Sequence, residues 1–138
     1  MTRRTLLVFA AMVLAGGGLV WLSAPNDHDH SRHHAAAHNI QVPALSPTAQ
    51  QGETLFDAQC AQCHGKNAAG TENGPPLVHK IYEPSHHSDL SFQRAAKFGV
   101  RAHHWSFGNM PPVAGITETE VDRVITYVRT LQRANGIQ

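Results

Sequence analysis

The sequence predicts an all-α domain, and three observations support that fold class. Residues 117–135 combine a helix-start signal with apolar side chains at helical spacing. Ser46-Pro47 is a second helix start, because proline fits the first turn of a helix. No segment shows a convincing alternation of apolar and polar side chains, which is the pattern typical of a strand.

The first two predicted helices follow from local signals. One begins at Ser46-Pro47 and runs to the first cysteine, Cys60. Gly52 within it has no side chain, so another backbone can approach closely there. A middle helix is expected over Asp89–Phe98, and Gly99 ends it.

The last predicted helix has the clearest boundaries. Thr117-Glu118-Thr119-Glu120 has the form of a capping box, with Thr117 as the N-cap and Glu120 three positions later. Asn135-Gly136 can end the helix. Its predicted buried face consists of apolar residues at helical spacing: Val121, Val124, Ile125, Val128 and Leu131.

The composition fits one globular domain and excludes several classes of protein. An apolar fraction of 41% argues against disorder throughout, and a formal net charge of +1 argues against a strongly basic nucleic-acid binder. Two cysteines build neither a disulfide-dense scaffold nor a four-cysteine zinc site. Aromatic residues make up only 7%, so the core would be thin unless another group fills it.

Residues 1–24 are predicted to be a targeting segment. Arg3 and Arg4 precede residues 6–22, which carry no charge and approach the roughly 17–25 residues of a membrane span. Leu22 stands where a cleavable signal usually has a small residue, so we favour an uncleaved anchor over a cleaved signal peptide. The arginines then place the rest of the chain outside the cytoplasm. A twin-arginine signal is a further alternative.

Residues 25–45 are predicted to be a flexible linker, and residues 46–138 the folded domain. The linker contains a histidine tract that either forms a solvated tether or binds copper, nickel or zinc, since imidazole suits those metals. The histidines of this tract are His28, His30, His33, His34 and His38.

Both cysteines lie in the run Cys60-Ala61-Gln62-Cys63-His64. This C-x-x-C-H pattern is typical of covalent haem attachment, in which two thiols one helical turn apart form thioethers and the histidine binds the iron. One alternative is a thioredoxin-like redox pair, which lacks its βαβ context here. Another is half a zinc site, which lacks two further ligands. We therefore expect one covalent haem c.

Met110 is the candidate for the second axial ligand of the iron. The other methionines, Met1 and Met12, lie in the targeting segment. Gly108 can adopt backbone angles closed to other residues, and Pro111-Pro112 stiffen the loop, as a weak thioether ligand requires. The alternative is a core methionine that fills a gap.

From about Pro47 to its end, the chain resembles the class I cytochromes c, the small monohaem electron carriers of bacteria and mitochondria. Five segments carry the resemblance: Gly52 with Phe56, residues 60–64, Gly74-Pro75-Pro76-Leu77, residues 108–112 and residues 124–128.

The resemblance implies the roles of several residues. The terminal helices would cross at Gly52 around the covalently bound haem, with Phe56 near Tyr127. The Pro75 carbonyl would accept a hydrogen bond from His64, which makes the histidine a stronger electron donor to iron. Leu77 would pack against the haem.

Residues 100–107 depart from the minimal pattern of that family. Trp105 and Phe107 are expected to pack on or beside the haem; alternatively, Trp105 donates its indole N–H to a haem propionate. Arg101 is either a propionate partner or a solvated surface residue.

Four loop histidines have no role in the minimal pattern. They either bind copper together or are exposed polar residues, and two of them, His103 and His104, compete with Met110 as an iron ligand in a bis-histidine alternative. The four are His86, His87, His103 and His104.

The expected function is one-electron transfer and not enzymatic catalysis. A haem with His64 and Met110 on both axial positions has no open site for a substrate, and methionine ligation predicts a relatively high reduction potential. The expected location is the periplasmic side of the bacterial cytoplasmic membrane, in a respiratory chain. The expected partners are membrane-bound redox complexes or oxidoreductases, with no nucleic acid among them.

Charge supports this kind of partner. From residue 44 onward, eight lysines and arginines balance eight aspartates and glutamates, so the domain lacks a strong field for steering onto an acidic partner. A membrane tether would compensate by raising the local concentration of a membrane-bound partner. The alternative functions are a haem-based sensor and a copper-handling cytochrome with a histidine-rich tether.

Overall fold

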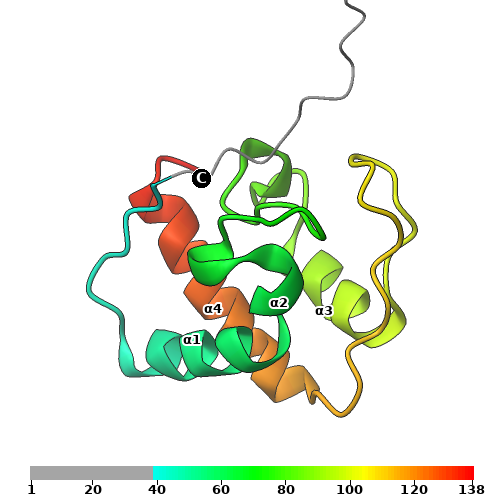
Figure 1. The fold of residues 1–138 in the computed structure, drawn as a ribbon. Coiled ribbons are helices and arrows are strands. Elements are labelled where there is room, and N and C mark those ends of the chain that lie inside the picture. Colours follow the sequence, from blue (N-terminus) through cyan, green and yellow to red (C-terminus); the bar gives the residue numbers. More distant parts are fainter. Residues whose placement is uncertain (1–38) are drawn as a thin grey trace, which may run out of the picture. The chain divides into compact units, whose positions relative to one another are not determined.

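The computed structural model describes residues 39–138, which form helices joined by loops (Figure 1). This part of the chain contains only isolated backbone bridges and no β-strand, which confirms the predicted all-α fold class. Its four α-helices are α1 (Pro47–Gln59), α2 (Ala61–His64), α3 (Asp89–Phe98) and α4 (Glu118–Ala134), with 3-10 turns at η1 (Lys66–Ala68) and η2 (Lys80–Tyr82).

The predicted targeting segment, residues 1–24, and the histidine tract lie outside the described residues. None of the helices within residues 39–138 is both long and apolar enough to cross a bilayer. The folded part begins earlier than the predicted boundary at residue 46. Ile40 and Leu45 pack against the core, and Gln41 exchanges two hydrogen bonds of 3.0 and 2.9 Å with the Asn135 side chain. The last residues of the expected linker therefore belong to the domain, because the end of α4 satisfies their backbone.

The helix ends form where the local signals predict them. Ser46 caps α1, since its hydroxyl accepts a hydrogen bond from the Ala49 amide at 3.2 Å. Gly99 ends α3 with a positive φ of 74°. At the start of α4, the Thr117 amide donates to the Glu120 carboxylate at 2.8 Å, and the Glu120 amide donates back to the Thr117 hydroxyl at 3.3 Å. The predicted capping box is confirmed.

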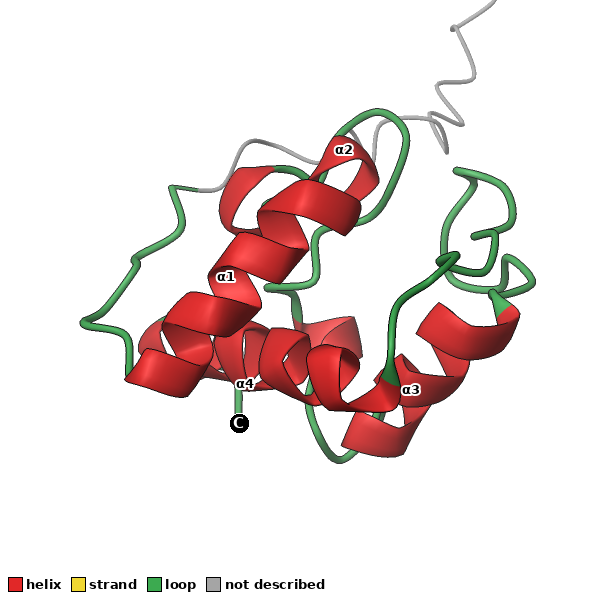
Figure 2. Ribbon diagram, turned by 90° about the horizontal axis from the view of Figure 1, so that it is seen from below, coloured by secondary structure: helices red, strands yellow, loops and turns green. Residues whose placement is uncertain are grey.

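The two terminal helices, α1 and α4, cross in close contact (Figures 1 and 2). A Cβ atom at Gly52 would lie 1.9 Å from the Arg123 carbonyl oxygen, so only glycine permits this approach. Next to it, the rings of Phe56 and Tyr127 have centroids 5.6 Å apart, and both side chains are fully buried. The predicted crossing is therefore confirmed, and the five residues of the predicted α4 face are all buried.

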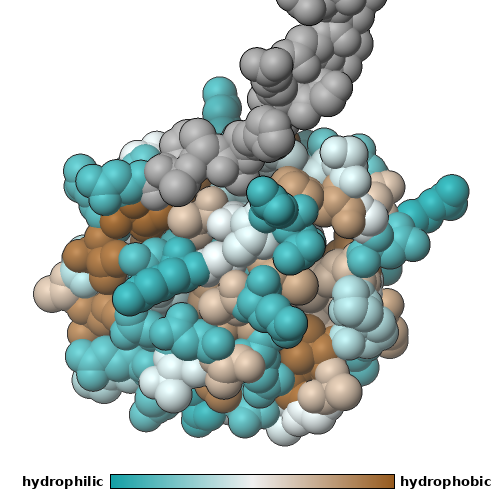
Figure 3. Space-filling model, viewed as in Figure 1, coloured by the Kyte–Doolittle hydropathy of each residue, from teal (hydrophilic) through white to brown (hydrophobic). Residues whose placement is uncertain are grey.

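The remaining elements surround one side of this crossing. Ala96 of α3 packs with Val121 and Ile125 of α4 in a second apolar cluster. Figure 2 shows the loop that follows α3 standing apart from α2. Figure 3 shows apolar side chains at the left of the molecule, over the segment before α1, where Val42 is 44% exposed.

Candidate haem site

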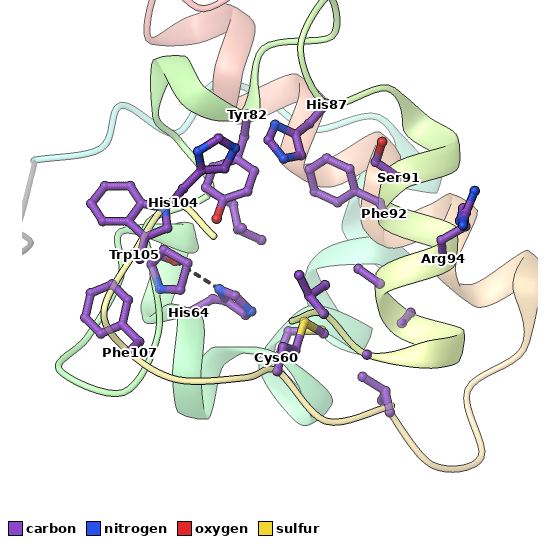
Figure 4. Close-up of a pocket in the computed structure, with 18 of the residues that line it drawn as sticks. Cys60, His64, Tyr82, His87, Ser91, Phe92, Arg94, His104, Trp105 and Phe107 are labelled. Atoms are coloured by element: carbon purple, nitrogen blue, oxygen red, sulfur yellow. Dashed lines mark hydrogen bonds between the residues drawn. The ribbon is translucent and has the colours of Figure 1, made fainter. Parts of the chain in front are cut away.

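A cavity of about 630 Å³ lies beside the helix crossing in the described part of the chain. Its wall is mostly apolar and draws on all four α-helices and on the loops before and after α3. Figure 4 shows Cys60, His64, Tyr82 and Phe92 around one common space. The predicted site residues that line the cavity are Cys60, His64, Pro75, Leu77, Trp105 and Met110.

The break between α1 and α2 positions the two cysteines. Cys60 ends α1, and the His64 amide then donates to the Cys60 carbonyl at 2.9 Å, which winds the motif into one helical turn. Cys60 lines the cavity, whereas Cys63 is exposed beside it. Burial, and after it the neighbouring Cys63 thiol, raises the pKa of Cys60 to about 11. Before haem is attached, the Cys60 thiol is therefore protonated at physiological pH.

His64 is held in one orientation by the segment that follows it. Its Nδ1–H donates to the Pro75 carbonyl at 2.9 Å, the hydrogen bond that the family resemblance implied. That bond leaves Nε2 as the free ring nitrogen. Burial lowers the pKa of His64, while the bond to Pro75 opposes the shift. The neutral imidazole, which is the form that binds a metal, is thus favoured.

Gly74 allows the Pro75 segment to reach His64. A Cβ atom at Gly74 would lie 2.7 Å from the Cys63 carbonyl oxygen, so a side chain there would push the segment away. Thr71 secures the same contact, because its hydroxyl donates to the Cys63 carbonyl at 2.6 Å and its amide donates to the Gly74 carbonyl at 2.9 Å. Leu77, 9% exposed, then turns into the cavity wall.

Met110 lines the same cavity from the loop between α3 and α4. Its backbone pairs with Val100 through two hydrogen bonds of 2.9 Å each, and this pairing closes the loop over residues 101–109. The Val113 amide donates to the Ala96 carbonyl at 2.8 Å and attaches the far end of the loop to α3. Gly108 has the positive φ expected of it, 92°. Met110 is the only methionine among the described residues.

Trp105 supplies a polar atom that the polypeptide leaves unsatisfied. Its indole nitrogen is buried and has no hydrogen-bond partner among the described residues. Burial raises the pKa of Tyr82, and the nearby Trp105 opposes that shift, although no hydrogen bond of ordinary geometry joins the two side chains. Phe107 packs on Trp105 with ring centroids 5.9 Å apart. A buried donor that has no acceptor among residues 39–138 fits a site in which a bound group provides one.

Arg101 does not line the cavity and is exposed. Its carbonyl accepts a hydrogen bond from His103 Nδ1 at 2.8 Å. Arg94 of α3 lines the cavity instead, with an exposed side chain. The structure therefore favours Arg94 over Arg101 as the cation nearest to the cavity.

Sequence reasoning missed the buried Arg129 on α4. Its guanidinium donates to Asp89 at 2.8 Å, to the Tyr82 carbonyl at 2.7 Å and to the His87 carbonyl, and it lies over the Phe92 ring. These bonds fix the loop before α3 against α4. The signal was present in the sequence, because Arg129 follows Ile125 by four positions and so falls on the apolar face of the helix.

The residues around the cavity fit a covalent haem. The apolar wall provides the low-polarity surroundings that a macrocycle needs, and the cavity volume lies within the roughly 300–1,000 Å³ of cofactor sites. Cys60 and Cys63 are spaced for two thioethers. The buried Trp105 N–H has no acceptor among the described residues, and a bound group could provide one. Haem would also fill the core that a 7% aromatic content leaves thin.

Comparison with known proteins agrees with this geometry. The family described as "Cytochrome c" matches residues 49–132. The chain is also 30% identical to "Cytochrome c-554(547)" of Halothiobacillus neapolitanus over 89 residues, which cover 61% of this chain and 97% of that protein. No solved structure matches significantly. The chain therefore belongs to the cytochrome c family, as a class I monohaem c-type cytochrome with covalently bound haem c and the electron-carrier role of that family.

Proposed function

We propose that His64 and Met110 are the two axial ligands of the haem iron, and that the protein is a one-electron carrier with a closed site. The observation that carries this proposal is that both residues line one cavity, with His64 Nε2 left free by the Pro75 hydrogen bond. When bound, haem supplies an iron centre that alternates between the ferric and ferrous states. The chain holds the ligands in place and excludes water.

The Met110 loop suits a weak thioether ligand. Its two hydrogen bonds to Val100 and the attachment of Val113 to Ala96 hold the backbone on both sides of the methionine. A thioether bonds ferric iron weakly, so a loop fixed in this way keeps the sulfur at the iron in both oxidation states. The soft ligand and the apolar wall both favour ferrous iron and raise the reduction potential.

The test is the optical spectrum of the ferric protein and its midpoint potential. The far-red band of sulfur-to-iron ligation is expected in the native protein and absent from Met110→Ala. Met110→His is expected to lower the midpoint by on the order of 0.1 V or more, within the roughly 0.8 V that axial ligands span.

Carbon monoxide gives the matched control. The reduced native protein should not bind it, whereas reduced Met110→Ala should, because that substitution opens one axial position. A native protein that binds carbon monoxide and lacks the far-red band would refute the closed site and favour a haem-based sensor.

We propose further that the domain works on the periplasmic side of the bacterial cytoplasmic membrane, anchored by residues 1–24, between membrane-bound redox complexes. Two features of the sequence support this proposal. Residues 6–22 carry no charge and directly follow Arg3 and Arg4, and the folded domain is formally neutral. Electrons would enter and leave beside the exposed Cys63, through brief, small contacts with partners.

Cell fractionation tests the location. The native chain should sediment with membranes and resist extraction by salt, while a variant with a cleavable signal in place of residues 1–24 should appear in the soluble periplasmic fraction. A native chain that is released by salt alone would overturn the anchor.

A further inference from the structure

Three histidines from two loops meet at the rim of the haem cavity. His86 and His87 belong to the loop before α3, and His104 belongs to the loop after it. One ring nitrogen from each lies within 4.8 Å of the others. His86 and His104 are exposed, His87 is half-buried, and all three line the cavity. Figure 4 shows His87 and His104 on the same side of the cavity as Tyr82.

The spacing suits a metal ion. The Nε2 atoms of His86 and His104 are 3.3 Å apart and share a hydrogen bond, whose proton a bound ion would replace. A tetrahedral ion with metal–nitrogen bonds of about 2.0–2.1 Å holds its ligand nitrogens roughly 3.3–3.4 Å from one another. The ring nitrogen that His87 offers lies within 4.8 Å of those of His86 and His104.

His87 is oriented as metal-binding histidines are. Its Nδ1–H donates to the Ile81 carbonyl at 2.6 Å, which leaves Nε2 with its lone pair available. Its own carbonyl accepts a hydrogen bond from the buried Arg129, and Arg129 also binds the Tyr82 carbonyl at 2.7 Å. The half of the site before α3 is thus fixed to α4.

The surroundings of His104 favour its neutral form. Desolvation, followed by the proximity of His103, His87 and His86, lowers the pKa of His104. A neutral imidazole is the form that ligates a metal. An all-imidazole donor set suits zinc and copper and does not suit calcium or magnesium, which prefer oxygen ligands.

We propose that His86, His87 and His104 form a binding site for a divalent transition ion, Zn²⁺ or Cu²⁺, with water in the fourth position. Bound there, the ion joins the loop before α3 to the loop that carries Met110. Its positive charge lies beside the haem cavity, where it opposes the extra positive charge of ferric iron. Occupation of the site therefore raises the midpoint potential of the cytochrome.

The coupling runs in both directions. An ion that favours the ferrous state must itself bind more tightly to the ferrous than to the ferric protein, by the same factor. Ion binding does not require Met110 to be an iron ligand. The ion site is therefore tested by Zn²⁺ titration, whereas the closed site is tested by the far-red band and by carbon monoxide binding.

The experiment uses the full-length holocytochrome after treatment with a chelator, in a background where the histidine tract cannot bind metal. Zn²⁺ is titrated by calorimetry, and one ion per chain is expected. Cu²⁺ added to the same protein should give an electron paramagnetic resonance spectrum with nitrogen couplings from imidazole. The background replaces the tract histidines by glutamine: His28→Gln, His30→Gln, His33→Gln, His34→Gln and His38→Gln.

Two substitutions remove ligands and one serves as a matched control. His86→Gln and His104→Gln should each weaken Zn²⁺ binding by more than about a hundredfold, since even residues behind the ligands contribute roughly 10–100-fold. His103→Gln removes an exposed neighbour that is not one of the three histidines whose ring nitrogens lie within 4.8 Å of one another. It should change the affinity by about twofold or less.

The midpoint potential provides the second measurement. Saturating Zn²⁺ should raise the midpoint in the background protein and leave it unchanged in His104→Gln. Absence of Zn²⁺ binding in the background protein, or an equal loss in His103→Gln, would overturn the site. Binding without a midpoint shift would overturn the coupling to the haem. An unchanged absorption spectrum and circular dichroism in each variant show that the exposed substitutions leave the fold intact.

Discussion

The crossing of α1 with α4 differs from the two loops that flank α3 in how completely the described side chains pack and pair with one another. At the crossing, Phe56, Tyr127 and Leu131 are fully buried against one another. In the loops, the Trp105 indole nitrogen is buried and has no partner within the described part of the chain, and His86 and His104 remain exposed at the rim of a cavity.

The difference separates a part of the domain that is filled by its own side chains from a part that leaves a cavity for a cofactor. The helix crossing closes because each side chain meets another side chain. The loops and the helices together enclose about 630 Å³ that their own side chains do not fill. A small domain with few aromatic residues thus gains the missing part of its core from haem.

Gly52→Ala should have the largest effect, because it breaks the crossing itself. The added Cβ would meet the Arg123 carbonyl at 1.9 Å, and a backbone atom cannot rotate away. We expect a loss of about 3 kcal/mol or more in the free energy of unfolding. Denaturant unfolding of the holocytochrome measures it.

Gln51→Ala is the control for that substitution, since Gln51 is exposed on the same helix. It should change the free energy of unfolding by less than about 0.5 kcal/mol. If Gly52→Ala were as stable as the native protein, the two helices could move apart with no loss in the free energy of unfolding. The close contact at the crossing would then not stabilise the domain.

Arg129→Met should have the next largest effect, because it cuts the connection between α4 and the loop before α3. The substitution keeps an apolar side chain on the Phe92 ring but leaves the Tyr82 and His87 carbonyls without this donor. We expect a loss of roughly 2–3 kcal/mol and a weakening of the proposed ion site by about tenfold or more.

Asp89→Asn measures the contribution of the ion pair alone, because it removes the charge of Asp89 and keeps the hydrogen bonds from Arg129 to the loop carbonyls. Asp89 is 66% exposed, so its charge contributes little, and we expect a loss of less than about 1 kcal/mol. A cost as large as that of Arg129→Met would place the stability in the ion pair and not in the bonds to the loop carbonyls.

Trp105→Phe should have the smallest effect on stability and a selective effect on the haem. Its indole N–H has no partner among the described residues, so we expect a loss of about 1 kcal/mol or less in the free energy of unfolding. On the alternative in which Trp105 donates to a haem propionate, we expect the midpoint potential to fall, because the propionate loses a donor that compensates its negative charge. Phe107→Leu, which removes no donor, is the control and should leave the midpoint nearly unchanged.

Local signals were sufficient for the helices. Ser46-Pro47, Gly99 and the Thr117–Glu120 capping box act over one helical turn, so the bounds of α1, α3 and α4 follow from neighbouring residues. The periodicity of α4 likewise indicated which of its side chains are buried. The C-x-x-C-H spacing identified the haem attachment because the chemistry depends on residues three positions apart.

The contacts of Arg129 and of the loop histidines were decided by the tertiary structure alone. Arg129 donates hydrogen bonds to Asp89, Tyr82 and His87, which lie 40, 47 and 42 positions earlier in the sequence. The imidazoles of His86 and His104 approach to 3.3 Å across eighteen positions. The sequence contains these residues, but their distances depend on how α3 packs on α4, because no local rule relates loops that meet only after the helices have docked.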